Sequence, residues 1–120
     1  MSEPDLSVEI EIHGVSDWLS TDLPAWVTRT RFHARLVERD GVIVLAAKEA
    51  SGVVGYALFD KPMSHLHYME TRKDCRRRGV TSRLWAKVWE EAIHAEITAS
   101  ADTEDGKRPR GSHRPASLDR

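Results

Sequence analysis

The sequence predicts an α/β (α+β) domain in which a mixed, mostly antiparallel sheet is flanked by helices. Three patterns predict it: two apolar, β-rich runs joined by a short turn, an alternating apolar and acidic segment near the N-terminus, and an amphipathic stretch in the second half. With 120 residues, of which 40% are hydrophobic and 31% charged, the chain has room for one modest domain with a core.

The first third of the chain predicts a strand and then helix. Residues 6–12 alternate apolar and acidic side chains, which is typical of a half-buried strand. Residues 17–39 favour helix, in one or two pieces, with a break at Thr21 and Asp22. Asp22 is a candidate N-cap for the second piece because its side chain can accept from free backbone N–H groups.

The middle of the chain predicts three strands, a basic loop and a helix. Residues 42–48 and 53–59 are apolar and β-rich, and the short glycine-containing turn between them indicates an antiparallel hairpin. Residues 64–71 predict a third strand, and a basic loop over 72–79 follows. An apolar residue then recurs every four positions, which predicts an amphipathic helix over 80–97.

The last part of the chain changes composition sharply. Residues 99–120 contain one large aliphatic side chain, Leu118, and no aromatic one. Such a segment cannot bury enough apolar surface to offset its ordering entropy, so it predicts a disordered polar tail. We therefore expect a folded domain over 1–98 and a tail over 99–120.

Charge and composition exclude several classes of protein. The 18 basic and 19 acidic side chains nearly cancel, which argues against a nucleic-acid-binding module. The lone cysteine forms no internal disulfide, and the longest apolar run, residues 42–47, is far shorter than the roughly 18 residues of a membrane span. We expect a cytoplasmic protein without membrane contact.

The basic loop and the start of the following helix carry the first chemical signal. A helix N-terminus offers free backbone N–H groups and the positive end of the helix dipole, which together bind anions. Gly79 lets the backbone approach a phosphate closely, and the arginines of residues 76–83 add charge that suits a pyrophosphate. A solvated basic loop that merely precedes a helix would show the same composition.

The Arg-x-x-Gly-x-small pattern of this loop resembles the acetyl-coenzyme A loop of the GNAT N-acetyltransferase superfamily, Gln/Arg-x-x-Gly-x-Gly/Ala. Arg76 and Gly79 match, whereas Thr81 stands where Gly or Ala is usual. Residues 42–59, VIVLAAKEASGVVGYALF, resemble the second and third strands of the family. The resemblance implies a GNAT-like fold, acetyl-CoA as co-substrate and no metal. It also implies that the phosphates are held, mostly through backbone groups, by Arg76, Arg77, Arg78, Gly79, Val80 and Thr81.

The strand before the loop carries the second signal. Ser64-His65-Leu66-His67 resembles the H-x-H strand of the arylalkylamine N-acetyltransferases, at the same distance before the glycine loop. An amine must lose a proton before it attacks the thioester, and an imidazole with a pKa of about 6.5 suits that task at neutral pH. By resemblance, His65 is the candidate base or proton relay and His67 its second member.

Other interpretations of this strand remain open. The two histidines can lie on a half-exposed sheet face without a function. They could share a metal ion, but no third ligand accompanies them, because Glu70 should point to the opposite face. By resemblance, Met69 and Thr71 contact the pantetheine arm through their backbone, and Thr71 replaces the usual Val.

The chain departs from the family after the helix at 80–97. The family continues with a fifth strand, a helix that often carries a thiolate-protonating tyrosine, and a final strand. Here the sequence turns polar, and neither Tyr56 nor Tyr68, the only tyrosines, occupies that place. By this resemblance we expect residues 1–98 to form a partial GNAT-like domain that lacks the C-terminal strand-helix-strand part of the fold. Three explanations are open: a homodimer that completes the sheet, a degenerate fragment, or a tail from a shifted reading frame.

The sequence thus predicts an acetyl-CoA-dependent N-acetyltransferase acting on a primary amine of a small molecule or peptide. The alternative is a catalytically incomplete GNAT remnant that serves as a CoA-binding or protein-interaction domain. A third hypothesis is an RNA- or anion-binding module that uses the arginines of residues 72–83.

Overall fold

The computed structural model describes residues 7–27 and 40–99, and the structural statements below concern these residues. One sheet carries the strands in the order β1-β2-β3-β4-β5. Its antiparallel members are β1 (Glu9–Gly14), β2 (Val42–Glu49), β3 (Gly52–Asp60) and β4 (His65–Thr71), and the short β5 (Thr98–Ala99) pairs parallel to β4. The predicted mixed, mostly antiparallel sheet is confirmed.

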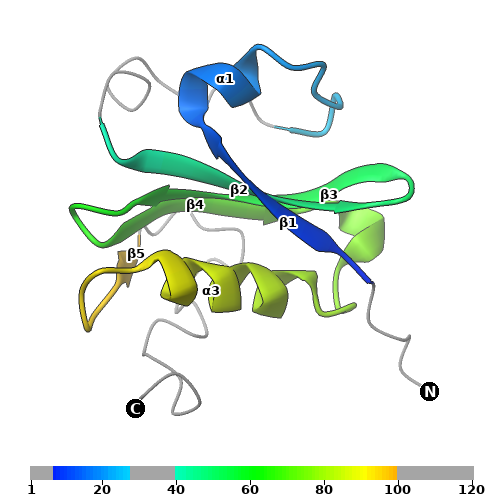
Figure 1. Cartoon of the computed structure of the whole chain (residues 1–120). Helices are drawn as coiled ribbons and strands as arrows, with labels where there is room; N and C mark the ends of the chain where they lie inside the picture. Colours follow the sequence, from blue (N-terminus) through cyan, green and yellow to red (C-terminus); the bar gives the residue numbers. More distant parts are fainter. Residues whose placement is uncertain (1–6, 28–39, 100–120) are drawn as a thin grey trace.

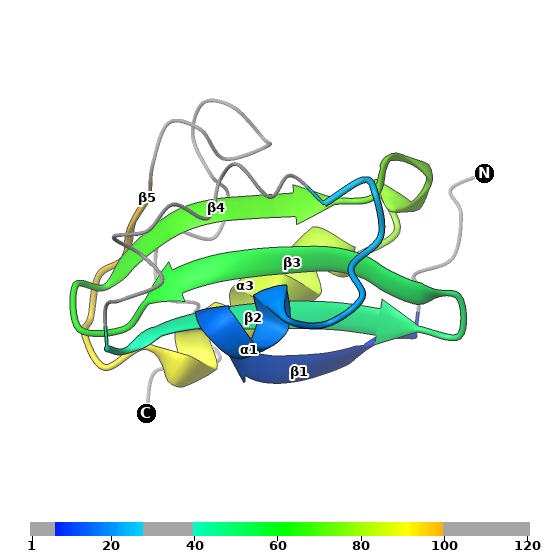
Figure 2. The same ribbon diagram turned by 90° about the horizontal axis from the view of Figure 1, so that it is seen from above.

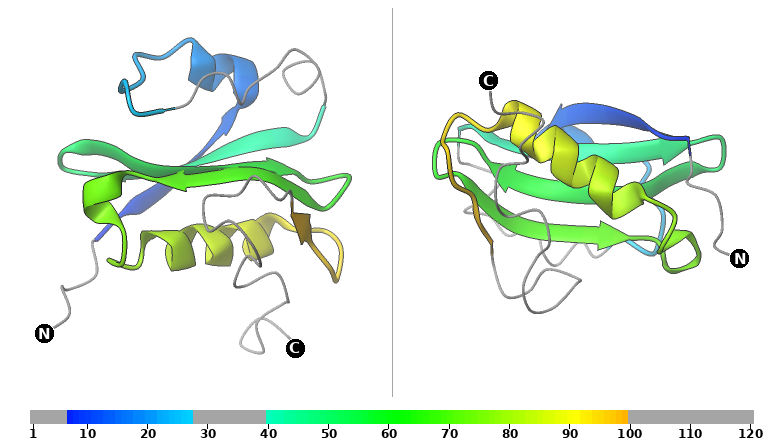
Figure 3. Two further views of the ribbon diagram at one scale, coloured as in Figure 1. Left: turned by 180° about the vertical axis from the view of Figure 1, so that it is seen from behind. Right: turned by 90° about the horizontal axis from the view of Figure 1, so that it is seen from below.

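The two α-helices within residues 7–27 and 40–99 lie on opposite faces of this sheet. Figure 1 shows α1 (Val15–Leu19) above the sheet and α3 (Val80–Glu91) below it. From above, α1 lies over β1 and β2 (Figure 2), and from below, α3 crosses the sheet diagonally (Figure 3). A 3-10 turn, η2 (Lys73–Cys75), connects β4 to α3. The fold is therefore a three-layer arrangement.

Each face of the sheet has its own core. On the α3 side, the buried faces of Leu84, Val88 and Trp89 pack on apolar side chains of β2, β3 and β4. Trp89 is 1% exposed, so it packs α3 on the sheet and does not form an aromatic binding surface. On the α1 side, Trp18 packs on Tyr56, whose ring centroid lies 5.1 Å away. The α1-side core consists of Val15, Trp18, Val27, Val42, Val44, Ala46, Tyr56, Leu58 and Tyr68.

The N-terminal elements differ in extent from the prediction. The strand expected over 6–12 lies at β1, and the helix expected from residue 17 begins at Val15 and ends at Leu19. The predicted break at Thr21 is confirmed, and its hydroxyl donates to the Trp18 carbonyl at 2.6 Å. Residues 22–27 contain no helix, so the structure shows no helix start at Asp22. The rest of that predicted helix, 28–39, lies outside the described residues.

The chain after α3 corrects the prediction. The helix expected to reach residue 97 ends at Glu91, because the chain must turn back before it can run beside β4. Ile97 enters the α3-side core, and the Thr98 N–H donates to the Ser64 carbonyl at 2.9 Å. The expectation that the fifth strand is missing is therefore wrong: a two-residue β5 is present and includes Ala99, the first residue of the predicted tail. The remainder of the tail lies outside the described residues.

Gly55 lets α3 approach the sheet. A Cβ atom at this position would lie 2.8 Å from Val80 Cγ1, 3.2 Å from Leu84 Cδ1 and 3.3 Å from the Glu70 carbonyl oxygen. Val80 is a stiff β-branched residue that is 1% exposed, so it has little room to move. Gly55 pairs with Thr71, the last residue of β4. The close approach thus fixes the start of α3 beside the end of β4.

We expect Gly55→Ala to lower the free energy of unfolding by about 1–3 kcal/mol through overpacking against Val80. Urea unfolding measures this loss. Gly14→Ala is the matched control, because a Cβ there meets only Asp17 Oδ2, at the ordinary distance of 3.6 Å. Equal stability of the two variants would contradict the packing argument.

Candidate active site

The basic loop has a defined backbone path between β4 and α3. The Arg72 N–H donates to the Val54 carbonyl at 2.8 Å, and the Cys75 N–H donates to the Arg72 carbonyl at 2.8 Å. Arg77 and Gly79 both adopt left-handed conformations, with φ of 65° and 82°. A non-glycine residue in this region costs about 1–2 kcal/mol, which explains the glycine at the entrance of α3.

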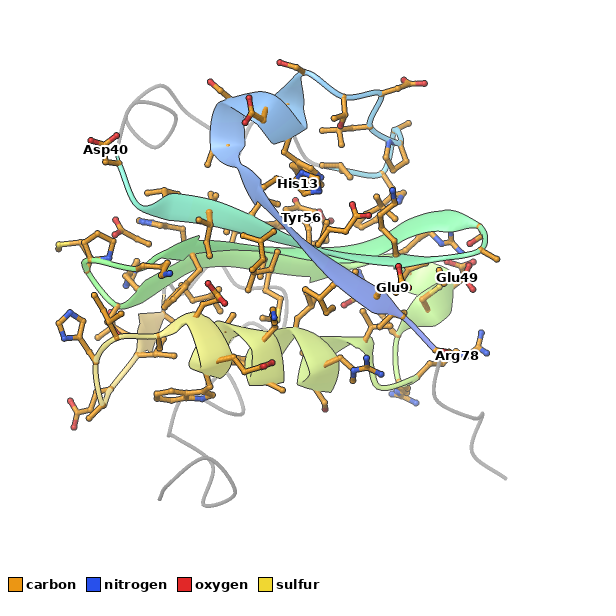
Figure 4. The ribbon with its side chains drawn as sticks, in the orientation of Figure 1. Glu9, His13, Asp40, Glu49, Tyr56 and Arg78 are labelled. Atoms are coloured by element: carbon orange, nitrogen blue, oxygen red, sulfur yellow. The ribbon has the colours of Figure 1, made fainter. Side chains whose placement is uncertain are left out.

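The start of α3 is chemically suited to an anion. Gly79 is its N-cap, no side chain caps the first turn, and this turn contains no acidic residue. Arg76 and Arg77 are exposed and Arg78 is half-buried, so their charges surround the positive end of the helix dipole. In Figure 4, Arg78 lies at the N-terminal end of α3. Glu49, the last residue of β2, lies at the same end of the sheet. The predicted phosphate-binding residues are thus contiguous at one end of the sheet.

Thr71 and Thr81, which both depart from the GNAT pattern, contact each other. Their Oγ1 atoms lie 3.1 Å apart, which is hydrogen-bond distance. Thr71 is 2% exposed, so this contact is largely shielded from water. The Arg76 Nε also donates to the Thr71 carbonyl, at 3.4 Å. The end of β4 is therefore joined to the loop and to the first turn of α3.

The two histidines lie together at the other end of β4. Their rings are 4.7 Å apart between centroids and nearly perpendicular, at 77°. His65 Nδ1 lies 2.6 Å from Thr98 Oγ1 of β5, and His67 Nε2 lies 3.6 Å from Asp60 Oδ2 of β3. The predicted common face of the pair is confirmed. The structure thereby adds Asp60 and Thr98, from two other strands, to the pair.

Burial controls the charge of His65. Partial burial lowers the pKa of its imidazole below the ordinary value of 6.5, and the negative charge of Asp60 opposes this by raising it. His65 is therefore mostly neutral at pH 7 and can accept a proton.

A β-bulge in β4 changes which side chains share a face. Tyr68 pairs with Leu58, but Leu66 pairs with Phe59, so His67 is the extra residue of the bulge. Beyond it, Tyr68 belongs to the α1-side core, and Glu70 accepts a hydrogen bond from the Tyr56 hydroxyl at 2.8 Å. Leu66 belongs to the α3-side core, so its neighbour His65 faces the α1 side, as Glu70 does. The expectation that Glu70 faces away from the histidines is therefore wrong, because the bulge breaks the strict alternation of the strand.

Cys75 is a packing residue of the loop. It is 3% exposed and belongs to the α3-side core. Burial raises the pKa of its thiol, although the Arg72 guanidinium opposes this shift. A thiol that stays protonated is a poor nucleophile. Arg72 is itself paired with Asp74, its Nε donating to Oδ1 at 2.6 Å.

A cavity of about 530 Å³ lies on the α1 side of the sheet. Its apolar walls include Trp18, Trp26 and Val53, and its polar ones include Glu11 and Lys48. His13, one of its lining residues, lies with Tyr56 on this side of the sheet (Figure 4). Neither histidine of β4 lines the cavity, so the structure does not join it to the candidate proton-transfer groups.

Comparison with known proteins identifies the family. The model of the acetyltransferase (GNAT) family matches residues 12–110. The chain belongs to the GNAT family. The crystal structure of ribosomal-protein-alanine N-acetyltransferase from Brucella melitensis biovar Abortus 2308 has a TM-score of 0.52 and 15% sequence identity, over 83% of this chain and 86% of that chain. At this identity the likeness shows a common fold. No curated protein matches the sequence.

The GNAT match covers more than the described fold. It runs to residue 110, past β5, and so includes part of the predicted polar tail. Two further observations concern the described residues. None of their helices is long and apolar enough to cross a membrane, and they contain no group of three or more His, Cys, Asp or Glu side chains placed to hold a metal ion.

Three residues that the structure places in or beside the candidate site were not predicted from the sequence. Asp60 was not a candidate because it directly precedes Lys61 and Pro62, which are typical of a turn, although counting the hairpin register would have placed it opposite His65. Gly55 lay within the family-like VVGYA segment, where a glycine in a buried strand could have signalled a close approach. Thr98 had no sequence signal, because β5 is only two residues long.

We expect the substitutions Thr71→Val and Thr81→Ala to be coupled in stability. Each alone leaves one hydroxyl without its 3.1 Å partner and should cost about 1 kcal/mol, whereas the double variant should cost less than the sum. Urea unfolding of the four proteins gives the coupling. Thr21→Val, on the α1 side of the sheet, is the control and should add independently to Thr71→Val. Additive costs in the first pair would show that the two hydroxyls do not interact.

Proposed function

We propose that this GNAT protein is an acetyl-CoA-dependent N-acetyltransferase that acts on a primary amine of a small molecule or peptide. The observation that carries the proposal is the layout of β4, which holds the histidine pair at one end and leads into the basic loop at the other. Six residue steps of about 3.3 Å separate His65 from Thr71, so about 20 Å of strand joins the two regions. An elongated co-substrate can lie along such a strand.

The loop would hold the phosphates of acetyl-CoA. Free N–H groups at the start of α3 and the left-handed Gly79 offer backbone donors, and Arg76, Arg77 and Arg78 supply charge. Val80 and Thr81 form the first turn, and their contribution would be through the backbone, because Val80 is buried and the Thr81 hydroxyl is bonded to Thr71. By family resemblance, the backbone of Met69 and Thr71 would contact the pantetheine arm.

The histidines would remove the proton of the acceptor ammonium. Neutral His65, directly or with His67 and ordered water, takes a proton from nitrogen, and the freed amine attacks the thioester carbonyl. Collapse of the tetrahedral intermediate breaks the C–S bond, and the nitrogen loses its second proton to solvent or to the departing sulfur, so that the amide and CoA are released. A thiol has a pKa of about 8.5, so the thiolate is a good leaving group near neutral pH even without a dedicated acid.

The acceptor and the assembly remain predictions. The family implies an acetyl acceptor but does not determine which amine it is. A homodimer that extends the sheet beyond β5 and a cytoplasmic location are supported by the sequence argument alone.

We expect acetyl-CoA to raise the melting temperature of the protein, and His65→Ala to leave that rise unchanged while it lowers amine-dependent CoA release by about 10²–10⁴-fold. The reason is that the imidazole acts on the acceptor proton and lies apart from the phosphate-binding loop. Calorimetry and a thiol-detection assay with a panel of amines measure the two effects. His13→Ala, on β1, is the matched control and should keep both.

The outcomes separate the hypotheses. Binding without turnover in the wild-type protein would favour the incomplete CoA-binding remnant. Absence of a thermal shift, together with salt-sensitive RNA binding, would favour the anion-binding hypothesis. Equal loss of affinity and turnover in His65→Ala would refute the role given to His65.

The pH dependence should follow the lowered pKa of His65. Above that pKa the imidazole is neutral and can accept a proton, so kcat/KM should fall only below pH 6.5 as the ring becomes protonated. A pH–rate profile measures this acidic limb. His65→Ala should remove it, and a limb that persists in this variant belongs to another group.

A further inference from the structure

The buried carboxylate of Asp60 lies beside the histidine pair. It is 1% exposed at the end of β3, where its backbone pairs with His65 across the sheet. Its Oδ1 accepts from the Met63 N–H at 3.1 Å, whereas Oδ2 lies 3.6 Å from His67 Nε2. The two oxygens therefore face different neighbours.

A turn role explains only half of this arrangement. An aspartate often accepts from a backbone N–H two or three residues on, and Met63 supplies that donor. Such turn residues are normally solvated, because burial of a carboxylate is costly unless it is paired. The second oxygen instead points at an imidazole, at a distance that becomes an ion pair whenever His67 is protonated. A carboxylate in this position stabilises a positive charge on the neighbouring imidazole, such as the charge gained with the substrate proton.

We propose that Asp60 is a positioning residue for the histidine pair, holding His67 in place and stabilising the positive charge that the pair acquires with the substrate proton. This inference rests on the proposed N-acetyltransferase function. The proton leaves the ammonium nitrogen as the N–H bond breaks, a new N–H bond forms on an imidazole, and one positive charge moves into the pair. That proton then passes to solvent, and the nitrogen loses a second proton, to solvent or to the CoA thiolate, as the C–S bond breaks and the amide forms.

The groups packed around the pair agree with this role. β3 contributes the Asp60 carboxylate, β4 the two imidazoles and β5 the Thr98 hydroxyl. Within the described residues, the charge that acts on His65 is that of Asp60, and it opposes the effect of burial. Without this carboxylate, protonated imidazole would lose its stabilising charge and the pair would become a weaker base.

The test is Asp60→Asn, which keeps the shape and can still accept from Met63 through Oδ1. We expect the pKa values of His65 and His67, followed by NMR titration of their ring signals, to fall in this variant. We also expect kcat to fall at least about tenfold at pH 7 with an unchanged KM for acetyl-CoA. Asp17→Asn, at an exposed position of α1, is the matched control and should change neither. Asp60→Glu, which retains the charge, should recover part of the loss.

Unchanged histidine pKa values and kcat in Asp60→Asn, with only a lower melting temperature, would overturn the proposal and leave Asp60 a turn residue. If the Asn variant does not fold, Asp60→Ser replaces it, because a serine hydroxyl can also accept from Met63. The titration needs no turnover. If the wild-type protein transfers no acetyl group but the histidine pKa values still fall in Asp60→Asn, the proposed function fails while the coupling of Asp60 to the pair is supported.

Discussion

The contact between α3 and Gly55 determines where the chemistry of this protein can lie. Because a glycine stands opposite Val80, the first turn of α3 approaches β3 more closely than any side chain would allow. Gly55 is also the partner of Thr71, so the same contact brings the helix start to the end of β4. The basic loop must then span a short gap, which it does through a 3-10 turn and two left-handed residues. The anion-binding geometry is thus a consequence of sheet and helix packing.

At the opposite end of β4, the bulge at His67 has a comparable effect. His65 and His67 lie side by side next to Asp60, and the extra residue turns Tyr68 and Glu70 to the α1 side of the sheet. Leu66, just before the bulge, belongs to the α3-side core, whereas Tyr68, just after it, belongs to the α1-side core. One extra residue therefore lets a single strand present an imidazole pair and still fill two cores. The arrangement also depends on β5, because the Thr98 hydroxyl lies at hydrogen-bond distance from the His65 ring.

Apolar periodicity and β-rich composition predicted β1 to β4 and the amphipathic start of α3, because burial leaves a pattern in the sequence. It failed where a local event interrupts the repeat. The bulge reversed the expected side of Glu70, and the chain reversal after Glu91 ended α3 early. Asp60 was not predicted as a site residue because an aspartate two residues before a proline is typical of a turn. The histidines and the loop were predicted by residue type and spacing, but their neighbours depend on contacts between strands.

The departures from the GNAT pattern at Thr71 and Thr81 are best understood as a pair. At the start of α3, the hydroxyl of the half-buried Thr81 stands in place of a hydrogen or methyl group and gains stability from a hydrogen-bond partner. A valine at position 71 could not provide one, whereas Thr71 does. The two changes therefore compensate each other, and the loop keeps its path into α3. In the sequence, Thr71 and Thr81 each weaken the family resemblance. In the structure, their contact preserves the path of the loop into α3 on which that resemblance depends.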